Sequence, residues 1–311
     1  MTVSSLFAMA SIALAAAAPA APSAPEVFAP GIVSGPLSDD APAFTPDGAT
    51  VFFGSSGGPL STILVSHRQG GAWSRPTVAP FSGEWSDQQV TMAPDGSFLV
   101  FVSNRPLAVG DKAHPSGNLW RVNRVGRGWS APIHLPATVN RDASIWAPSI
   151  AGDGSLYFID REKPGAPFRL WRSQWRGGTY EAATPVSFGD PSTQDVDPAV
   201  APDESFIVYA STRPGSDKPE RLFIAHRDGD HWGRPVDLGD RINGASDTNG
   251  ARLGPDRLTL YFTSDRTTPP HLPRAGGQAE RDLARARSWD NGLTNIWRVT
   301  LSPWLAANPP G

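Results

Sequence analysis

Acidic and arginine side chains recur in this sequence at fixed places beside short apolar runs. The acids precede one set of runs, and an arginine closes the next set in four copies. The acids are Asp39, Asp40, Asp87, Asp195, Asp197 and Asp247, and the arginines are Arg105, Arg161, Arg213 and Arg266. Because a guanidinium binds a carboxylate through two parallel hydrogen bonds, the pattern predicts acid–arginine pairs between neighbouring repeats. The alternative is a ring of convergent polar groups that binds a small ligand or an acidic peptide.

Departures from the recurring pattern are better candidates for ligand recognition, because a ligand needs asymmetry and a repeat supplies symmetry. Aromatic or amide side chains replace the acids in some copies, and exposed aromatic rings suit stacking on sugars or peptides. Packing between repeats is the alternative for these rings. The candidate ligand-binding residues are Trp85, Asp87, Gln88, Trp146, Asp195, Asp197, Asn249, Arg105, Arg213 and Arg266.

Catalysis by paired carboxylates is the chemistry to weigh against binding. Glycosidases use two carboxyl groups about 5–10 Å apart, and the recurring acids could converge in that way. However, arginine neighbours would keep these acids ionised instead of ready to donate a proton. The sequence has no nucleophile elbow, zinc-binding His-Glu-x-x-His, phosphate loop or calcium loop. We therefore predict no catalytic residue, metal ligand or cofactor, and retain a glycoside hydrolase or lectin as the alternative.

Composition limits the partners of the chain. Its 311 residues are 39% hydrophobic and 18% charged, with a net charge of −3, which argues against nucleic acid as the main partner. After residue 25 no run approaches the roughly 20 apolar residues that span a bilayer. The chain contains no cysteine, which excludes disulfides and thiolate chemistry.

The N-terminus has the composition of an export signal. Residues 6–18 are small and apolar, and residues 19–25 are rich in Ala and Pro, as in a cleaved secretory peptide. We expect a signal peptide over residues 1–24, cleaved near residue 20 or 24, and a periplasmic or secreted protein. No Lys or Arg precedes Arg68, so a disordered leader on a cytosolic protein is the alternative.

The rest of the chain repeats five times. Each copy has a turn of the Pro-Asp-Gly type followed by an aromatic and β-branched run, and the turn aspartates are Asp47, Asp95, Asp153, Asp203 and Asp256. They are 48, 58, 50 and 53 residues apart, a spacing typical of β-propellers. The Asp-Gly pair favours a tight hairpin. Those turns lie at the end opposite the predicted site and need no function, while recurring tryptophans predict a core between repeats.

Each copy resolves into four candidate strands, except that the fifth stops after three. Residues 27–35 align with residues 236–244, so the N-terminal strand is expected to complete the last unit. We predict an all-β chain: a single five-bladed β-propeller of four-stranded antiparallel blades over residues 25–303, closed by the N-terminal strand. Residues 304–311 form a C-terminal tail. Such closure leaves no complete exposed edge.

Two long loops lie on the face that carries the recurring acids. They span residues 106–117 and 267–294, and residues 279–287 in the second favour a helix. Long loops in a compact domain are often functional, although a mobile insertion is an equal alternative. His114 and His271 lie in these loops, where a solvent-facing role is expected instead of metal ligation.

The repeat resembles the WD40-like propeller repeat of the TolB type, found in cell-envelope propeller proteins. The copy from Asp195 to Arg213 carries the resemblance best, with Asp-x-Asp-Pro, Ala-Pro-Asp and Ser-x-Arg in order. The resemblance covers nearly all of residues 26–303 and implies the fold. For function it implies a non-catalytic binding or scaffold propeller. We expect a monomer that recognises a protein, polysaccharide or peptidoglycan partner through its loop-rich face.

Overall fold

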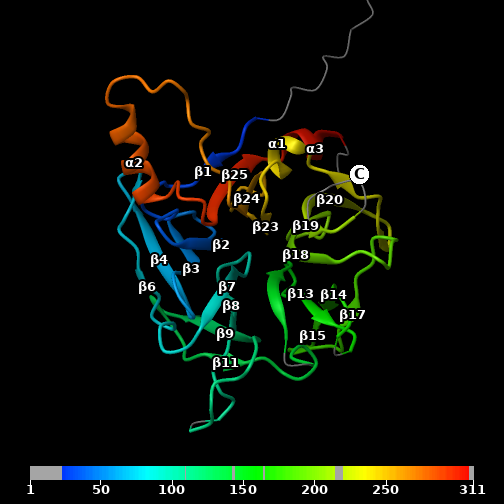
Figure 1. Ribbon diagram of the computed structural model, residues 1–311. Coiled ribbons are helices and arrows are strands. Elements are labelled where there is room, and N and C mark those ends of the chain that lie inside the picture. The colour runs from blue at the N-terminus through cyan, green and yellow to red at the C-terminus, as the bar shows by residue number, and fades with distance from the viewer. Residues whose placement is uncertain (1–22, 109, 142–143, 164, 214–219, 308–311) are drawn as a thin grey trace, which may run out of the picture.

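Five antiparallel sheets surround a central axis in the computed structural model of this chain (Figure 1). The structure describes residues 23–108, 110–141, 144–163, 165–213 and 220–307. The predicted five-bladed β-propeller is therefore confirmed. Residues 1–22 of the expected signal peptide and residues 308–311 of the expected tail lie outside the described residues.

The first three blades follow one another along the chain, each with its innermost strand first. Blade 1 contains β2 (Ser38–Phe44), β3 (Thr50–Ser56), β4 (Ser61–Gln69), β5 (Ala72–Trp73) and β6 (Thr77–Val78). Blade 2 contains β7 (Asp87–Met92), β8 (Phe98–Ser103), β9 (Asn118–Val125), β10 (Gly128–Trp129) and β11 (Ile133–His134). Blade 3 contains β12 (Trp146–Ile150), β13 (Leu156–Arg161), β14 (Phe168–Ser173) and β17 (Thr184–Pro185), with a small hairpin of β15 (Trp175–Arg176) and β16 (Thr179–Tyr180).

The last two blades differ in how their outermost strand is supplied. Blade 4 contains β18 (Asp195–Val200), β19 (Phe206–Ser211), β20 (Arg221–Asp228), β21 (His231–Trp232) and β22 (Val236–Asp237). Blade 5 contains β23 (Thr248–Leu253), β24 (Thr259–Ser264), β25 (Asn295–Thr300) and, from the N-terminus, β1 (Glu26–Val27). Glu26 pairs with Arg298 and Val27 with Trp297. The predicted closure by the N-terminal strand is therefore confirmed.

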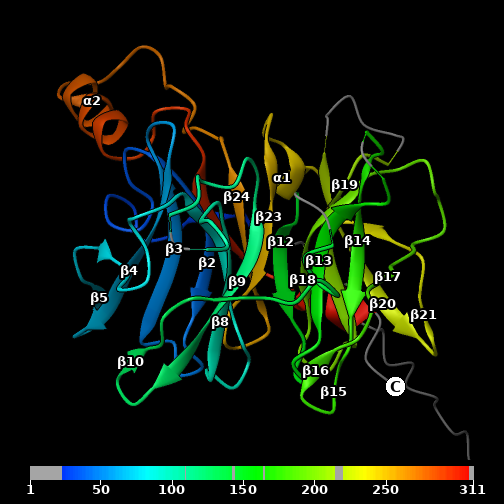
Figure 2. The ribbon, with the colours of Figure 1, turned by 90° about the horizontal axis from the view of Figure 1, so that it is seen from below.

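The two ends of the propeller carry different connections. The hairpins between first and second strands lie at one end, which we call the turn face. The opposite end, the loop face, carries the connections between second and third strands. Figure 2 shows the propeller from the side, with α2 (Gln278–Ser288) at one end and the β15–β16 hairpin at the other. The helix that the sequence favours over residues 279–287 is confirmed, and none of its residues is buried.

Each turn-face hairpin is held by its aspartate. Asp47 accepts a hydrogen bond from the Ala49 backbone N–H at 3.0 Å, and Asp203 accepts one from Ser205 at 3.2 Å. The same bond, from a backbone N–H two residues later, occurs in all five copies. Such bonds let an aspartate close a turn locally. The repeated aspartates therefore have a structural role.

Every innermost strand is interrupted at one place by a register shift. The residue at the shift has a positive φ, between 46° and 61°, in all five blades. These residues are Ala41, Gln89, Ala147, Asp197 and Gly250. Only the fifth is a glycine, although a left-handed backbone is unfavourable for other residues. A bulge of this kind bends the strand and redirects side chains next to it, here beside the central channel.

The hydrophobic core lies between neighbouring blades. Trp120, Trp171, Trp232 and Trp297 are buried there, as their recurrence predicts. Short helices α1 (Asp240–Asn243) and α3 (Ser302–Ala307) complete the described elements. Among the described residues, no helix is long and apolar enough to cross a membrane.

Candidate functional site: the central channel

The predicted pair of Asp87 and Arg105 forms in blade 2. Arg105 donates to Asp87 at 2.8 Å and to the Phe81 carbonyl at 3.1 Å, and Ser82 donates to the same carboxylate at 2.8 Å. The Asp87 side chain is fully buried, so a charged partner is needed to offset its loss of hydration. Asp87 therefore has a structural role, since its bonds join blade 2 to the segment that leads into that blade.

Blade 4 contains the equivalent pair. Arg213 donates to both oxygens of Asp195 at 3.3 Å and to the Phe188 carbonyl at 3.3 Å. Ser211 also donates to Asp195, at 2.6 Å. Burial raises the pKa of Asp195, and these hydrogen bonds and the Arg213 charge partly oppose that effect. In both pairs the acid and the arginine belong to one blade, so the prediction that they link neighbouring blades is wrong: the arginine reaches across two strands of one sheet.

The remaining blades do not repeat the pair. In blade 5 Thr248 stands where the acid would be, and Arg266 donates to the carbonyls of Arg241 and Ile242. In blade 3 Asp160 pairs with Arg141, and Arg161 lies over the Phe168 ring instead. The recurring function of Arg105, Arg213 and Arg266 is therefore to hold the incoming segment through a backbone carbonyl.

The aromatic and amide candidates are dispersed. Trp146 begins β12 and packs between blades 2 and 3, where a Cβ on Gly117 would lie 3.1 Å from its ring. Gln88 pairs with Val102 in β8, and Trp85 is half-buried in the segment before β7. Asn249 donates to Asp247 at 2.8 Å. Of the candidate residues, only Asn249 and Asp197 lie close to the other acids of the channel, which are described below.

Asp197 occupies the bulge of β18 and reaches the next blade. Its carboxylate accepts a hydrogen bond from the Gly250 backbone N–H at 3.2 Å. Gln89 does the same between blades 2 and 3, accepting from the Ala147 N–H at 2.9 Å. At these two interfaces, the side chain at one bulge thus binds the backbone at the bulge of the next blade.

A second group of acids, Asp40, Glu220 and Asp247, lies on the loop-face side of the channel, and none of the three forms an ion pair with a described residue. Burial raises the pKa of Asp40 to about 6 and that of Glu220 to about 7. The pKa of Asp247 is also raised by burial and by the charges of Asp265 and Asp197. Asn249 donates a hydrogen bond to Glu220, and this bond partly opposes the rise in the pKa of Glu220. These carboxyl groups lie near enough for their charges to repel one another.

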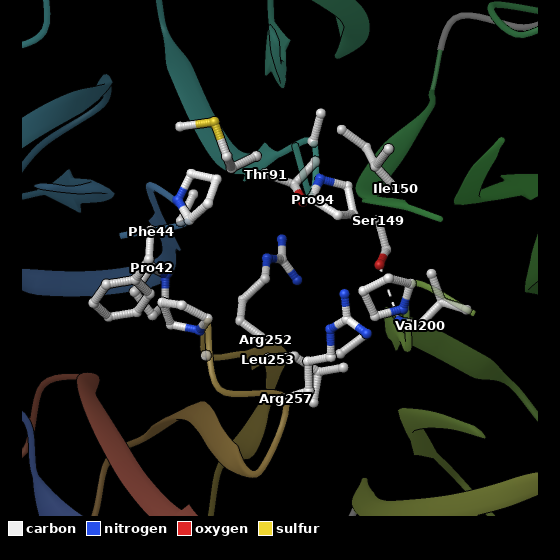
Figure 3. Close-up of a pocket in the computed structure, with 18 residues that line it drawn as sticks. Pro42, Phe44, Thr91, Pro94, Ser149, Ile150, Val200, Arg252, Leu253 and Arg257 are labelled. Atoms are coloured by element: carbon white, nitrogen blue, oxygen red, sulfur yellow. Dashed lines mark hydrogen bonds between the residues drawn. The ribbon is translucent and has the colours of Figure 1, made fainter. Parts of the chain in front are cut away.

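Arg252 projects into the channel from β23. Two positions beyond each bulge, the innermost strands carry Ala43, Thr91, Ser149, Ala199 and Arg252, so four small residues face one arginine. Figure 3 shows the Arg252 guanidinium at the centre of the ring of strands. Its side chain is buried, and burial lowers the pKa of Arg252, while the charges of Asp197 and Asp40 oppose that effect. No described carboxylate lies within ion-pair distance of it.

A cavity of about 320 Å³ opens from Arg252 toward the turn face. Its 18 lining residues include two arginines, Arg252 and Arg257, and no acid. Thr91 and Ser149 contribute hydroxyl groups, and the turn prolines line the mouth. These are Pro46, Pro94, Pro202 and Pro255. The channel therefore holds acids toward the loop face, whereas the charged residues that line its turn-face cavity are both arginines.

Sequence reasoning missed Arg252, Arg257 and Glu220. Arg252 carried a usable signal, because it is the largest departure from the repeat in the innermost strands. The candidate residues were compared only at the positions of the recurring acids, and Arg252 does not occupy one of those positions. Glu220 lies outside the repeat pattern and has no comparable signal. The sequence analysis assigns no function to the turns, although the turn prolines surround the cavity.

Fold and channel together define a five-bladed β-propeller with a charge-divided channel. No protein-family model matches this chain, and no curated protein matches it. Among solved structures, a TolB from Agrobacterium tumefaciens is similar, with 17% identity and a TM-score of 0.48 over 74% of this chain and 70% of that one. A TolB from Acinetobacter baumannii has 19% identity and a TM-score of 0.40, over 64% of this chain and 45% of that one.

A thermostable family-43 glycoside hydrolase is also similar in structure. It has 12% identity and a TM-score of 0.50, covering 73% of this chain and 83% of that one. At such low identity the similarity establishes the shared fold alone. One fold commonly supports unrelated functions, so the function has to be argued from the residues of this channel.

Proposed function

We propose that this chain is a non-catalytic binding or scaffold propeller that recognises a protein or cell-envelope polymer through its loop face. It acts in the periplasm or outside the cell, as the composition of its N-terminus suggests. The observation that supports the absence of catalysis is the state of Asp87 and Asp195. Each is buried against an arginine of its own blade, so neither is available as an acid or a nucleophile.

The loop face offers hydrogen-bond acceptors in a place that suits a polar partner. Glu220 and Asp247 lie beside Asn249 at the channel mouth, and all three are half-buried. Carboxylates in such a position can accept hydrogen bonds from sugar hydroxyls, ammonium groups or guanidinium groups. A peptidoglycan strand or a basic segment of an envelope protein carries these donors.

Thermal-shift measurements on the mature protein test this proposal. The panel contains peptidoglycan fragments, neutral and acidic oligosaccharides and basic peptides. A ligand at 100 times its Kd stabilises the folded state by about 2.7 kcal/mol. We expect a shift that Asp247→Asn and Glu220→Gln reduce and that Asp228→Asn, an exposed acid of blade 4, leaves unchanged. If the panel and envelope cross-linking both give no partner, the proposal fails.

One observation favours a second function, a glycoside hydrolase or lectin. Asp40 and Glu220 lack ion-pair partners among the described residues, and their pKa values are raised to about 6 and about 7. A raised pKa is what a general acid in a glycosidase requires. In this alternative Glu220 donates a proton to the leaving oxygen while an ionised Asp40 or Asp197 serves as base or nucleophile.

Product analysis separates the two functions. A catalytic propeller would release reducing sugar from a member of the oligosaccharide panel, and Glu220→Gln would abolish the release. The same release should survive Asp87→Asn if that variant folds, since Asp87 is structural. Binding without any product, in protein that retains its native melting transition, supports the non-catalytic function.

A further inference from the structure

We propose that the turn-face cavity binds a single carboxylate carried on a short apolar stem. Two sources have this chemistry: the C-terminus of an apolar peptide and a free organic acid. This site lies at the opposite end of the channel from the loop face. It is therefore independent of the function proposed above.

The first argument is the state of Arg252. Its side chain is 5% exposed, its Nη1 donates to the Ala251 carbonyl at 2.7 Å, and its Nε has no partner among the described residues. Arg105 and Arg213, by contrast, each bind a carboxylate directly. An unused donor on a buried guanidinium is costly unless an acceptor satisfies it. A ligand carboxylate in the cavity would supply that acceptor.

The second argument is the charge of the cavity wall. Arg252 and Arg257 both extend into the cavity from the strand and turn of blade 5 (Figure 3), and no acid lines it. A guanidinium is suited to a planar carboxylate through two parallel hydrogen bonds. Asp40 and Asp197 are near Arg252, on the loop-face side, and their charges already act on it. They disfavour a dianion such as phosphate more strongly than a monoanion.

The third argument concerns the other donors. Ser149 accepts a hydrogen bond from the Val200 N–H at 3.0 Å, so its own hydroxyl hydrogen is free to turn toward a ligand. Thr91 lines the same cavity, and its hydroxyl makes no hydrogen bond within the described part of the chain. Arginine together with hydroxyl donors makes a site for an anion at the base of the cavity.

The fourth argument specifies the stem. Between Arg252 and the mouth, the walls are apolar side chains and the rims of the turn prolines. The apolar side chains are Phe44, Met92, Ile150, Val200 and Leu253. A volume of about 320 Å³ is at the small end of ligand pockets. It suits a chain of a few carbons or the last residues of a peptide.

Isothermal titration of the full chain tests the proposal with hexanoate as the probe and hexanamide as its neutral control. We expect hexanoate to bind with a Kd of about 1 mM or tighter and hexanamide to bind at least tenfold more weakly. Arg252→Gln should weaken hexanoate binding at least tenfold, and Arg257→Gln about threefold. Arg121→Gln is the matched control, because Arg121 lines a neighbouring cavity on the same face and not the proposed site.

Thr91→Leu keeps the test decisive if Arg252→Gln does not fold, since it fills the cavity without removing charge. It should abolish hexanoate binding. The proposal is overturned if hexanoate does not bind, if hexanamide binds equally well, or if the cavity variants bind like wild type. Tighter binding of inorganic phosphate than of hexanoate would also overturn it. In each case, the loop-face experiments remain separately interpretable.

A pair of peptides distinguishes the two sources of carboxylate. The tripeptide Leu-Val-Ala is titrated with a free and with an amidated C-terminus. Binding of the free form at least tenfold tighter than hexanoate, and lost on amidation, assigns the site to peptide C-termini. Binding no tighter than that of hexanoate assigns it to free organic acids.

Discussion

The two ends of the central channel were built from the same five innermost strands, yet they have opposite charge. Toward the loop face, the strands and their neighbours present Asp40, Asp197 and Glu220, whose pKa values are raised by burial. Toward the turn face, the residues that line the cavity include Arg252 and Arg257 and no acid. The backbone repeats at both ends, so the difference comes from single side chains. In this propeller, the repeated residues form the framework, and single residues that depart from the repeat give each end of the channel its charged groups.

The acid–arginine pairs belong to the repeated framework of the propeller. Asp87–Arg105 and Asp195–Arg213 occupy equivalent places and make equivalent bonds to an incoming carbonyl. Arg252 has no counterpart in any other blade. The comparison therefore predicts that changes to the pairs affect stability, whereas changes at Arg252 affect binding.

Arg105→Ala gives the largest expected loss of stability. It leaves Asp87, which is fully buried, without its charged partner. Removing one member of a buried ion pair typically costs about 3–5 kcal/mol. Urea denaturation followed by tryptophan fluorescence measures the free energy of unfolding.

Arg266→Ala is the matched comparison, because Arg266 occupies the equivalent place but binds carbonyls of the incoming segment and the Ser264 hydroxyl instead of a carboxylate. Its loss should cost about 1.5–3 kcal/mol, the range of lost hydrogen bonds to a charged group. Equal losses in the two variants would show that the carboxylate adds nothing to the role of the arginine.

Gly54→Ala should destabilise the loop-face side through one contact. A Cβ at Gly54 would lie 2.3 Å from an oxygen of Asp40, so that carboxyl group must move. Overpacking of this kind costs about 1–3 kcal/mol. Gly58→Ala is the control, since nothing lies within 4 Å of a Cβ there.

A double variant identifies the cause of that loss. If the clash with Asp40 is responsible, Gly54→Ala should cost much less in a protein that already carries Asp40→Ala. Independent effects that simply add would contradict this explanation. The coupling between the two changes is read from the four free energies of unfolding.

The fold was predictable from the sequence because its signals repeat. Five Asp-containing turns and the alignment of residues 27–35 with 236–244 specify the blades and their closure, and each is a local pattern summed over copies. The site was less predictable. Arg252 is a single residue, and its importance depends on which way a bulged strand turns its side chain. Glu220 reaches the channel through tertiary structure alone, which no spacing in the sequence encodes.

Mild acid should stabilise the protein, in contrast to the usual behaviour of paired carboxylates. The pKa values of Asp39, Asp40 and Glu220 are raised to about 7, 6 and 7, so the folded state binds protons that the unfolded state has released. The stability that these three groups contribute is fully present below their pKa in the unfolded chain. It is lost as the pH rises through their pKa in the folded protein. Stability should therefore fall between about pH 4 and pH 7.

Urea midpoints across this range measure the effect, and Asp40→Asn with Glu220→Gln provides the comparison. The double variant should show a flatter dependence, because its two side chains cannot ionise. A wild-type midpoint that rises steadily from about pH 4 to pH 7 would contradict the raised values. Arg252→Gln should steepen the dependence, since its charge favours the ionised form of Asp40.

The smallest expected effect is at the turn-face hairpins, where Asp203→Ala removes hydrogen bonds from the Ser205 N–H at 3.2 Å and hydroxyl at 2.7 Å. The site is exposed, so the loss should be about 0.5–1 kcal/mol. Asp203→Asn retains an acceptor oxygen and should lose less. These bonds lower the pKa of Asp203. The stability that Asp203 contributes is therefore present above its pKa in the unfolded chain and declines as the pH falls through its pKa in the folded protein. A loss in Asp203→Ala that persists unchanged in strong acid would mean that the carboxylate is not what closes the turn, and the repeated aspartate would need another explanation.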